Sequence, residues 1–261
     1  MTRLVSNGVF NSNKHTFFIV SIFNLGGNAA LVLTQHLINK NSTVLPKLQI
    51  LVYPWVQMFS IATYSGFQYG HKGLLTHISP GQLILSYLGY KNENLTDERI
   101  QAIHYSNHTL LLDAPTRKKF FSYTDPSLIP EVYKNNLSYY NNSRISEYKS
   151  KLPTKLDDSN ILVRDKKFAT DVKKLFTLEM SPGLMNDEQL KKLPTTYTIV
   201  CEWDALKDDN LIFAGRLKKV GVKSEIAYYD TCYHGMVPVI NEYTLARKIS
   251  DNLIKFISEN I

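Results

Sequence analysis

The sequence predicts an α/β fold in which a mostly parallel sheet is interrupted by a long helical insertion. Residues 16–23 and 48–53 are short apolar runs, and the helix-forming segment 26–38 lies between them. This strand–helix–strand order is the unit from which parallel sheets are built. Residues 55–192 are rich in Tyr, Asn, Ser and Lys, and strand-like runs resume only at residue 195. The insertion therefore separates the second strand from the third.

The first strand and its turn carry a clear local pattern. Residues 16–23 are apolar without polar alternation, as in strands that are buried on both faces. Gly26 and Gly27 follow at a tight turn, and the helix is expected to run to Ile38. The second apolar run, residues 48–53, is stopped by Pro54.

The insertion is expected to be irregular and mostly helical. Helical patterns lie over residues 80–88, 97–105 and 170–178. Loop signals interrupt it at Pro115, Asp125-Pro126, Pro153 and Ser181-Pro182-Gly183. Five aromatic residues either pack into the core, which is the favoured interpretation, or line an apolar pocket. They are Trp55, Phe59, Tyr64, Phe67 and Tyr69.

The C-terminal part returns to the strand–helix alternation. Strands and helices are expected over residues 195–202, 209–220, 223–229 and 243–261. Asp208 and Asp209 suit the positive end of the first of these helices, and Lys218 and Lys219 suit its negative end. Gly221 is placed to end that helix.

Composition bounds the class of protein. The 261 residues are 44% hydrophobic and 20% charged, which is typical of a globular chain. The net charge of +7 comes from Lys pairs scattered over separate segments, so no nucleic-acid partner is expected. No apolar run approaches the ~20 residues that span a membrane. No metal or cofactor motif is apparent, and we expect neither.

Cysteines and sequons bear on the compartment. Cys201 and Cys232 could form one bond, stay reduced, or pair with something outside this chain. The start of the chain shows no apolar region typical of a secretory signal. Five N-x-S/T sequons are a mild excess over chance, and they begin at Asn41, Asn94, Asn107, Asn136 and Asn141.

The turn after the first strand fits the nucleophile elbow of α/β-hydrolases, whose pattern is G-x-S-x-G. Laid on that pattern, residues 22–26 place Asn24 at the nucleophile position and Ile22 at the first glycine. An amide nitrogen is a poor nucleophile because its lone pair is delocalised. Asn does tolerate the positive φ of such a turn. The pattern therefore keeps the turn and loses the nucleophile. Ser21 is the nearest hydroxyl, but it lies within the strand.

An acid and a histidine follow later strands in the order that α/β-hydrolases use. Asp204 comes just after one strand, and His234 lies in the loop after the next. In a catalytic triad the acid orients the imidazole, and the imidazole takes the proton of the nucleophile. Each residue also has an alternative, purely structural interpretation. Asp204 could cap the following helix, and His234 could be an ordinary turn residue. Their joint order after successive strands favours the triad interpretation.

These segments resemble the arylacetamide deacetylase and neutral cholesterol ester hydrolase group, relatives of hormone-sensitive lipase. That group carries G-D-S-A-G-G-N at the elbow, and residues 24–28 match its latter part. Residues 201–209 resemble its acid segment, and Tyr233-His234-Gly235 its histidine segment. Weaker matches lie at residues 51–54, 181–184 and 193–197. The resemblance runs from about residue 10 to the end and is loose in the insertion.

The resemblance implies a fold, an activity and a location. The chain would be the C-terminal part of an α/β-hydrolase, one partial domain over residues 1–261 with a cap at about 55–192. Asp204 and His234 would be the acid and base in hydrolysis of carboxylic esters or amides with apolar acyl groups. Cys201 would match a cysteine that pairs further upstream. The location implied is the lumenal side of the endoplasmic reticulum.

The chain departs from that family where the chemistry occurs. Asn24 replaces the serine, and the H-G-G-G motif that supplies oxyanion-hole donors is absent from the sequence. The backbone N–H of Leu25 would supply one donor. Loss of a single such donor costs about 10²–10³ in rate. We therefore expect no serine-hydrolase turnover from this chain.

Three functional classes stay open. The first is an ester hydrolase by family whose present product is inactive. The second is a non-catalytic protein that binds a lipid or another ligand, or a partner, on the same scaffold. In that class the strand over residues 16–23, expected at the sheet edge, could pair with a protein partner or with a second copy. The third is a hydrolase with a carboxylate nucleophile formed by deamidation of Asn24, which the bulk of Leu25 disfavours.

Overall fold

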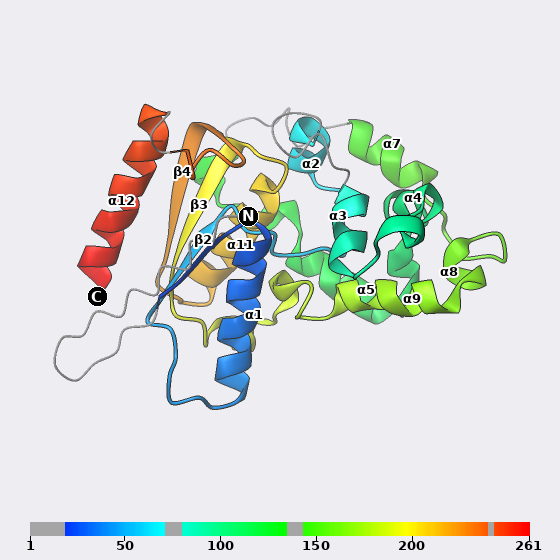
Figure 1. Cartoon of the computed structure of the whole chain (residues 1–261), viewed down its shortest axis with the longest axis horizontal. Helices are drawn as coiled ribbons and strands as arrows, with labels where there is room; N and C mark the ends of the chain where they lie inside the picture. Colours follow the sequence, from blue (N-terminus) through cyan, green and yellow to red (C-terminus); the bar gives the residue numbers. More distant parts are fainter. Residues whose placement is uncertain (1–18, 71–79, 135–142, 240–242) are drawn as a thin grey trace.

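The computed structural model describes residues 19–70, 80–134, 143–239 and 243–261. Its centre is a sheet of four parallel strands in the order β1-β2-β3-β4, as Figure 1 shows. The strands are β1 Ile19–Phe23, β2 Leu48–Val52, β3 Thr195–Trp203 and β4 Ser224–Tyr233. The predicted parallel α/β sheet is confirmed.

The sheet is buried on both faces at its centre. Every residue of β2 is buried, and so are residues 196–201 of β3, which explains why both strands are mostly apolar without polar alternation toward one face. Within the described part of the chain, β1 pairs with β2 alone and lies at the edge, as the sequence predicted. Residues 16–18 of the expected first strand lie outside the described residues.

Helices cover the two faces of this sheet (Figure 1). α1 Leu25–Asn39 and α11 Lys207–Lys219 pack on one face, where Leu31 and Phe213 meet Leu51 of β2. α12 Thr244–Asn260 packs on the other face through Ile249 and Phe256. The charges expected at the ends of α11 lie in its first and last turns, and Gly221 follows it with φ 85°.

The insertion forms a group of short helices beside the sheet (Figure 1). Its α-helices are α2 Tyr64–Tyr69, α3 Pro80–Tyr87, α4 Asp97–Tyr105, α5 Ala114–Tyr123, α7 Ser143–Lys151, α8 Ile161–Arg164, α9 Lys166–Lys173 and α10 Asp187–Leu190. Its 3-10 turns are Asn92–Asn94, His108–Leu111, Pro126–Leu128, Glu131–Tyr133, Lys174–Phe176 and Pro182–Leu184. That this region acts as a cap on one partial domain stays a prediction.

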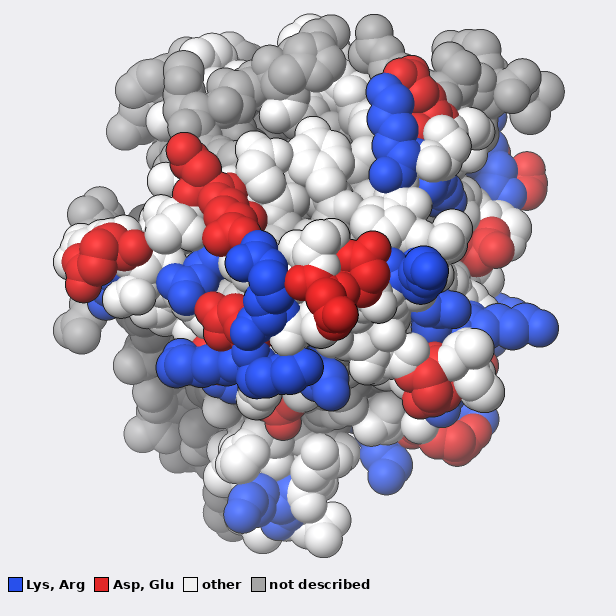
Figure 2. Space-filling model, turned by 90° about the vertical axis from the view of Figure 1, so that its right-hand side faces the viewer, with Lys and Arg blue, Asp and Glu red and all other residues white. Residues whose placement is uncertain are grey.

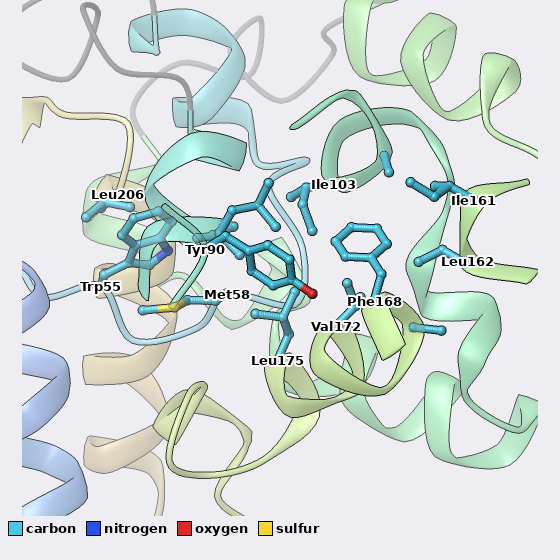
Figure 3. Close-up of a cluster of buried hydrophobic side chains, with 14 residues drawn as sticks. Trp55, Met58, Tyr90, Ile103, Ile161, Leu162, Phe168, Val172, Leu175 and Leu206 are labelled. Carbon is cyan, nitrogen blue, oxygen red and sulfur yellow. The ribbon is translucent and has the colours of Figure 1, made fainter. Parts of the chain in front are cut away.

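One apolar cluster joins the insertion to the sheet end. Trp55 and Leu206, which lie next to β2 and β3, pack in the same cluster as Phe168 and Val172 of α9 (Figure 3). Three of the five singled-out aromatics are buried, namely Trp55, Phe59 and Tyr69. Tyr64 and Phe67 are only half-buried. Core packing therefore accounts for most of this group.

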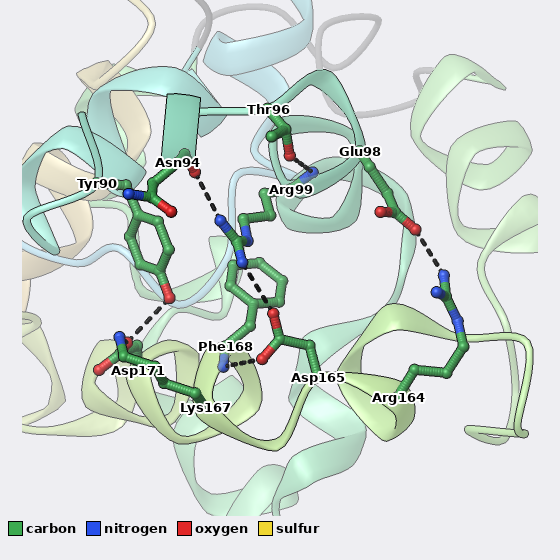
Figure 4. Close-up of polar contacts among 10 residues, drawn as sticks. All are labelled: Tyr90, Asn94, Thr96, Glu98, Arg99, Arg164, Asp165, Lys167, Phe168 and Asp171. Atoms are coloured by element: carbon green, nitrogen blue, oxygen red, sulfur yellow. Dashed lines mark hydrogen bonds and ion pairs between the residues drawn. The ribbon is translucent and has the colours of Figure 1, made fainter. Parts of the chain in front are cut away.

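Polar contacts hold α4 against the segment that contains α8 and α9 (Figure 4). Arg99 pairs with Asp165 at 2.9 Å, and Glu98 pairs with Arg164 at 2.5 Å. Figure 2 shows Lys and Arg interspersed with Asp and Glu over the face of the insertion. On this face the scattered basic residues are thus balanced by acidic neighbours.

Two local expectations were wrong. Pro115 was expected to mark a loop in the insertion, but it lies in the first turn of α5, where its missing N–H costs nothing because that group has no helical acceptor. The helix expected at 170–178 is α9, which ends at Lys173 and passes into a 3-10 turn. Asp165 caps α9 by accepting the N–H of Phe168, which moves its start upstream.

The two cysteines are joined to each other. Cys201 of β3 and Cys232 of β4 form a disulfide, with their Cα atoms 4.7 Å apart. This corrects the expectation that Cys201 pairs with an upstream cysteine. The strands that carry them are neighbours, and the irregular register between Cys201 and Trp203 brings the two side chains together.

Within the described ranges, no helix is long and apolar enough to cross a membrane.

Candidate active site

The turn between β1 and α1 is built around Asn24. Its backbone has φ 49° and ψ −115°, a conformation that few residues other than Gly and Asn adopt. Its N–H donates to the carbonyl of Val52 at 3.1 Å, and its own carbonyl accepts from Trp55 at 3.2 Å and Gly27 at 2.9 Å. These bonds anchor the turn to the end of β2. The elbow expected from the sequence is therefore present with Asn at its apex.

The side chain of Asn28, in the first turn of α1, holds the elbow to two other segments by hydrogen bonds. Its side-chain nitrogen donates to the carbonyls of Trp55 and Met180, both at 2.9 Å, and the residue is fully buried. It thereby ties α1 to the chain after β2 and to the insertion. Asn28 belongs to the elbow motif in the sequence, but the motif alone predicted no role for its side chain. A buried polar residue on an apolar helix face was the available signal.

Asp204 and His234 meet at the carboxyl ends of β3 and β4. The His234 Nδ1 atom lies 2.9 Å from the Asp204 Oδ2 atom. Asp204 is 1% exposed and His234 6% exposed, so the contact is shielded from water. The other oxygen of Asp204 accepts the N–H of Leu206 at 2.9 Å. One oxygen of Asp204 thus orients His234, and the other holds the turn that leads to Leu206.

Tyr53 lies against this pair. Its ring centroid is 4.5 Å from that of His234, and its backbone has φ 37° just after β2. Burial and the charge of Asp204 raise the pKa of Tyr53 far above its usual range, so the phenol stays neutral. Sequence reasoning saw this residue only as the end of a strand. The positive φ that turns its ring toward His234 has no signal in the sequence.

The structure brings together two of the three predicted catalytic positions. Asn24, Asp204 and His234 all follow parallel strands, so all three lie at the carboxyl edge of the sheet. The described contacts join Asp204 to His234. The backbone contacts of Asn24 go to the end of β2, and its side-chain oxygen is buried with no hydrogen-bond partner among the described residues. Leu25 is the first residue of α1, so its N–H has no acceptor within the helix.

Two neighbouring acidic residues, Asp208 and Asp209, lie at the start of α11. Asp209 is buried, and both of its oxygens accept from the Gln57 side chain, at 3.0 and 3.1 Å. Burial, opposed by the Gln57 bonds, raises the pKa of Asp209 to about 8. Asp208 accepts the backbone N–H of Ser65 at 2.8 Å. This pair connects the insertion to the helix that follows the Asp204 turn.

An open pocket of about 640 Å³ lies between the insertion and α11, which contributes Asp208 and Ile212. It lies between the segment 57–64 and α4, α5 and α7, and its lining does not include Asp204 or His234. Of the five aromatic residues singled out in the sequence, Phe59 and Tyr64 line it, and Trp55, Phe67 and Tyr69 do not. Burial lowers the pKa of His108, another lining residue, so its imidazole is neutral. The lining of the cavity therefore mixes apolar side chains, such as Ile103 and Phe121, with polar and charged ones, such as Arg117 and Asp125.

Comparison with known proteins places this geometry in context. A family model described as alpha/beta hydrolase fold matches residues 142–238. Arylacetamide deacetylase of Bos taurus is 28% identical over 238 residues, covering 90% of this chain and 52% of the relative. Neutral cholesterol ester hydrolase 1 of Bos taurus is 26% identical over 246 residues, covering 90% and 53%.

A solved structure supports the fold. One chain from a study of two fungal esterases from Rhizomucor miehei aligns with TM-score 0.50 and 13% identity, covering 91% of this chain and 48% of that one. This chain spans about half the length of the curated relatives that it matches. It has the α/β-hydrolase fold and resembles in sequence the arylacetamide deacetylase and neutral cholesterol ester hydrolase group.

Proposed function

We propose that this chain is a relative of carboxylic ester and amide hydrolases that does not form an acyl-enzyme. The proposal is carried by Asn24, which occupies the apex of the elbow where these hydrolases place serine. Asp204 and His234 remain paired at 2.9 Å. A histidine base activates a hydroxyl or thiol, and the amide of Asn24 offers neither. The Asp204–His234 pair is therefore present, but residue 24 offers it no hydroxyl or thiol to deprotonate.

Covalent labelling tests this directly. A fluorophosphonate probe reacts with an activated serine, so the native chain is expected to remain unlabelled. Hydrolysis of p-nitrophenyl acetate is expected to match buffer supplemented with free imidazole. The Asn24→Ser variant is the matched control for the probe, because it restores the hydroxyl at the same turn. Labelling of the native chain at Ser21 or at any other serine would contradict the proposal.

A second candidate function is binding of an apolar ester, an amide or a lipid without turnover. The observation that favours it is the cavity of about 640 Å³ between the insertion and α11, within the range of small-molecule sites. Phe59, Ile103 and Phe121 give it apolar walls, and Arg117 and Lys149 offer charged groups.

Equilibrium binding of an uncleaved apolar amide tests this second function. Ala62 lines the cavity, and Ala62→Phe would fill part of it. We expect the thermal shift caused by the amide to be lost in that variant. It is expected to persist in Leu33→Ala, a change on the exposed side of α1. Equal shifts in both variants would place binding elsewhere.

The compartment that we propose is the lumenal side of the endoplasmic reticulum. The Cys201–Cys232 disulfide supports it, since such bonds persist in oxidising compartments. The sequon residues Asn41 and Asn94 are exposed and could accept a glycan. Treatment of the protein from its native cells with an N-glycosidase is expected to raise its gel mobility. An unchanged mobility, together with free thiols, would argue against this compartment.

A further inference from the structure

The backbone of Asn24 has a property beyond its fit to the elbow. Because Cα is tetrahedral, a ψ of −115° turns the nitrogen of Leu25 until it nearly eclipses the Cβ atom of Asn24. In a helix, with ψ of about −42°, or a strand, with ψ of about +135°, the same nitrogen is rotated well away from Cβ. An eclipsed arrangement is what closure of a five-membered ring from Cγ to that nitrogen needs.

Among the described residues, no hydrogen bond engages the two groups that would form the ring. The Asn24 side chain makes no capping bond to α1, and its Oδ1 is buried without a hydrogen-bond partner in the described part of the chain. Leu25 is the first residue of α1, so its N–H has no acceptor within the helix. By contrast, the Asn28 amide is held by two carbonyls. Asn24 therefore combines ring-closing geometry with a side-chain amide that no hydrogen bond from the described residues holds.

We propose that Asn24 is a site of spontaneous modification, at which its side chain cyclises to a succinimide and then opens to a carboxylate. The nitrogen of Leu25 loses its proton to water or hydroxide and forms a bond to Cγ of Asn24. The Cγ–Nδ2 bond then breaks, and the leaving nitrogen takes up a proton and departs as ammonia. Water adds to one imide carbonyl and breaks its bond to nitrogen, which leaves aspartate or isoaspartate at position 24.

The start of α1 assists both steps. The positive end of a helix dipole stabilises the negative charge that develops on the Asn24 amide oxygen during ring closure. The same field stabilises the carboxylate product, which lowers the net charge of the chain by one. The folded chain therefore favours the product as well as the path to it.

The bulk of Leu25 is the main argument against this reaction in a flexible peptide. Bulk slows cyclisation there because it restricts access to the ring-closing conformer. In the folded chain that conformer is already fixed, by the bonds from Asn24 to Val52 and Trp55. An unfolded chain visits positive φ at a cost that corresponds to roughly a 5–30-fold lower population. We expect cyclisation to be about tenfold faster in the folded chain than in the unfolded one.

The chain contains its own controls. Asn28 and Asn39 lie in α1 with helical backbone, and Asn39 is exposed. Asn107 shares φ 49° with Asn24 but has ψ 55°, which does not bring its following nitrogen beside Cβ. Positive φ alone therefore predicts reaction at Asn107, whereas the ψ argument predicts it at Asn24.

The experiment incubates the full chain at mildly alkaline pH, folded in buffer and unfolded in guanidinium chloride. Trypsin then releases residues 15–40, which contain Asn24, Asn28 and Asn39, and fragmentation locates the mass gain of deamidation. We expect Asn24 to convert faster in the folded sample and the other two to convert faster in the unfolded one. Hydroxylamine, which cleaves at a succinimide, is expected to cut the folded chain after residue 24.

Asn24→Gln is the assignment control, since its longer side chain would need a six-membered ring and is expected to lose both signals. A rate at Asn24 that is equal or lower in the folded chain would overturn the proposal, as would faster conversion at Asn107. The inference does not depend on the proposed function, because the readout is mass and cleavage rather than activity.

Discussion

Tyr53 packs its ring against that of His234, with the two ring centroids 4.5 Å apart. The Nδ1 atom of the same imidazole lies 2.9 Å from the Oδ2 atom of Asp204. The histidine is thus held by one apolar and one charged neighbour. Its position is fixed by the ends of three strands, since Tyr53 follows β2, Asp204 follows β3 and His234 follows β4.

The Asp204–His234 pair is expected to contribute to stability even without catalysis. Asp204→Ala removes the partner of His234 and the acceptor of the Leu206 N–H. Its free energy of unfolding is expected to fall by about 1–3 kcal/mol, the cost of leaving buried polar groups unpaired. Asp204→Asn keeps an acceptor for Leu206 and should lose less. Urea unfolding measures both, and equal stability of Asp204→Ala and the native chain would contradict this role.

Restoring the nucleophile alone is expected to give feeble activity. Asn24→Ser supplies a hydroxyl at the elbow, but Ile22 remains where hydrolases place glycine. The sequence also lacks H-G-G-G, and each missing oxyanion donor costs about 10²–10³ in rate. The measurement is initial-rate hydrolysis of p-nitrophenyl acetate, with Asn24→Ala as the control. Recovery to the rate of an active esterase would mean that the oxyanion hole is complete.

Asp209 is expected to make stability fall as pH rises. Its pKa is raised to about 8 by burial, whereas a free aspartate titrates near about 3.9. Between these values the folded chain binds more protons than the unfolded one, so unfolding free energy decreases with pH through this window. Asp209→Asn should remove this loss and gain more than about 1 kcal/mol near pH 8, with little gain near pH 4. Thermal unfolding across this range measures it, and an equal gain at both ends would contradict the assignment.

The Cys201–Cys232 disulfide is expected to stabilise the end of the sheet that carries Asp204 and His234. It closes a loop of sequence separation 31 between β3 and β4. Replacing both cysteines by serine is expected to cost about 2–4 kcal/mol. Denaturant unfolding of the double variant, compared with the native chain under reducing and oxidising conditions, measures the effect. No difference between reduced and oxidised native chain would show that the bond does not form.

The isolated chain is expected to associate through β1. Within the described residues this strand pairs with β2 alone, and its sequence carries no charge to block another strand. Light scattering of the purified chain should therefore report oligomers or aggregates. Val20→Lys places a charge on the edge and is expected to reduce association. A monodisperse native chain with cooperative unfolding would contradict this prediction.

The sequence determined the order of the elements and predicted that Asp204 and His234 would meet. Apolar runs with strand length specified the four strands, and the pattern of Asp204 and His234 after successive strands specified which residues would meet. Both inferences depend only on local periodicity and on the rule that parallel strands end at one edge. Element ends were less accurate, as at α9 and Pro115, because capping bonds decide them.

Tertiary structure alone decided what surrounds that pair. Tyr53 has a positive φ, and its ring contacts that of His234. Cys201 and Cys232 form a disulfide between β3 and β4, next to an irregularity in the register of the two strands. The conformation that turns Leu25 toward the Asn24 side chain is likewise held by bonds to Val52 and Trp55. Each depends on contacts between residues distant in sequence. A local pattern specifies which dihedral angles a residue tolerates, whereas packing and hydrogen bonds across the fold select the one that it adopts.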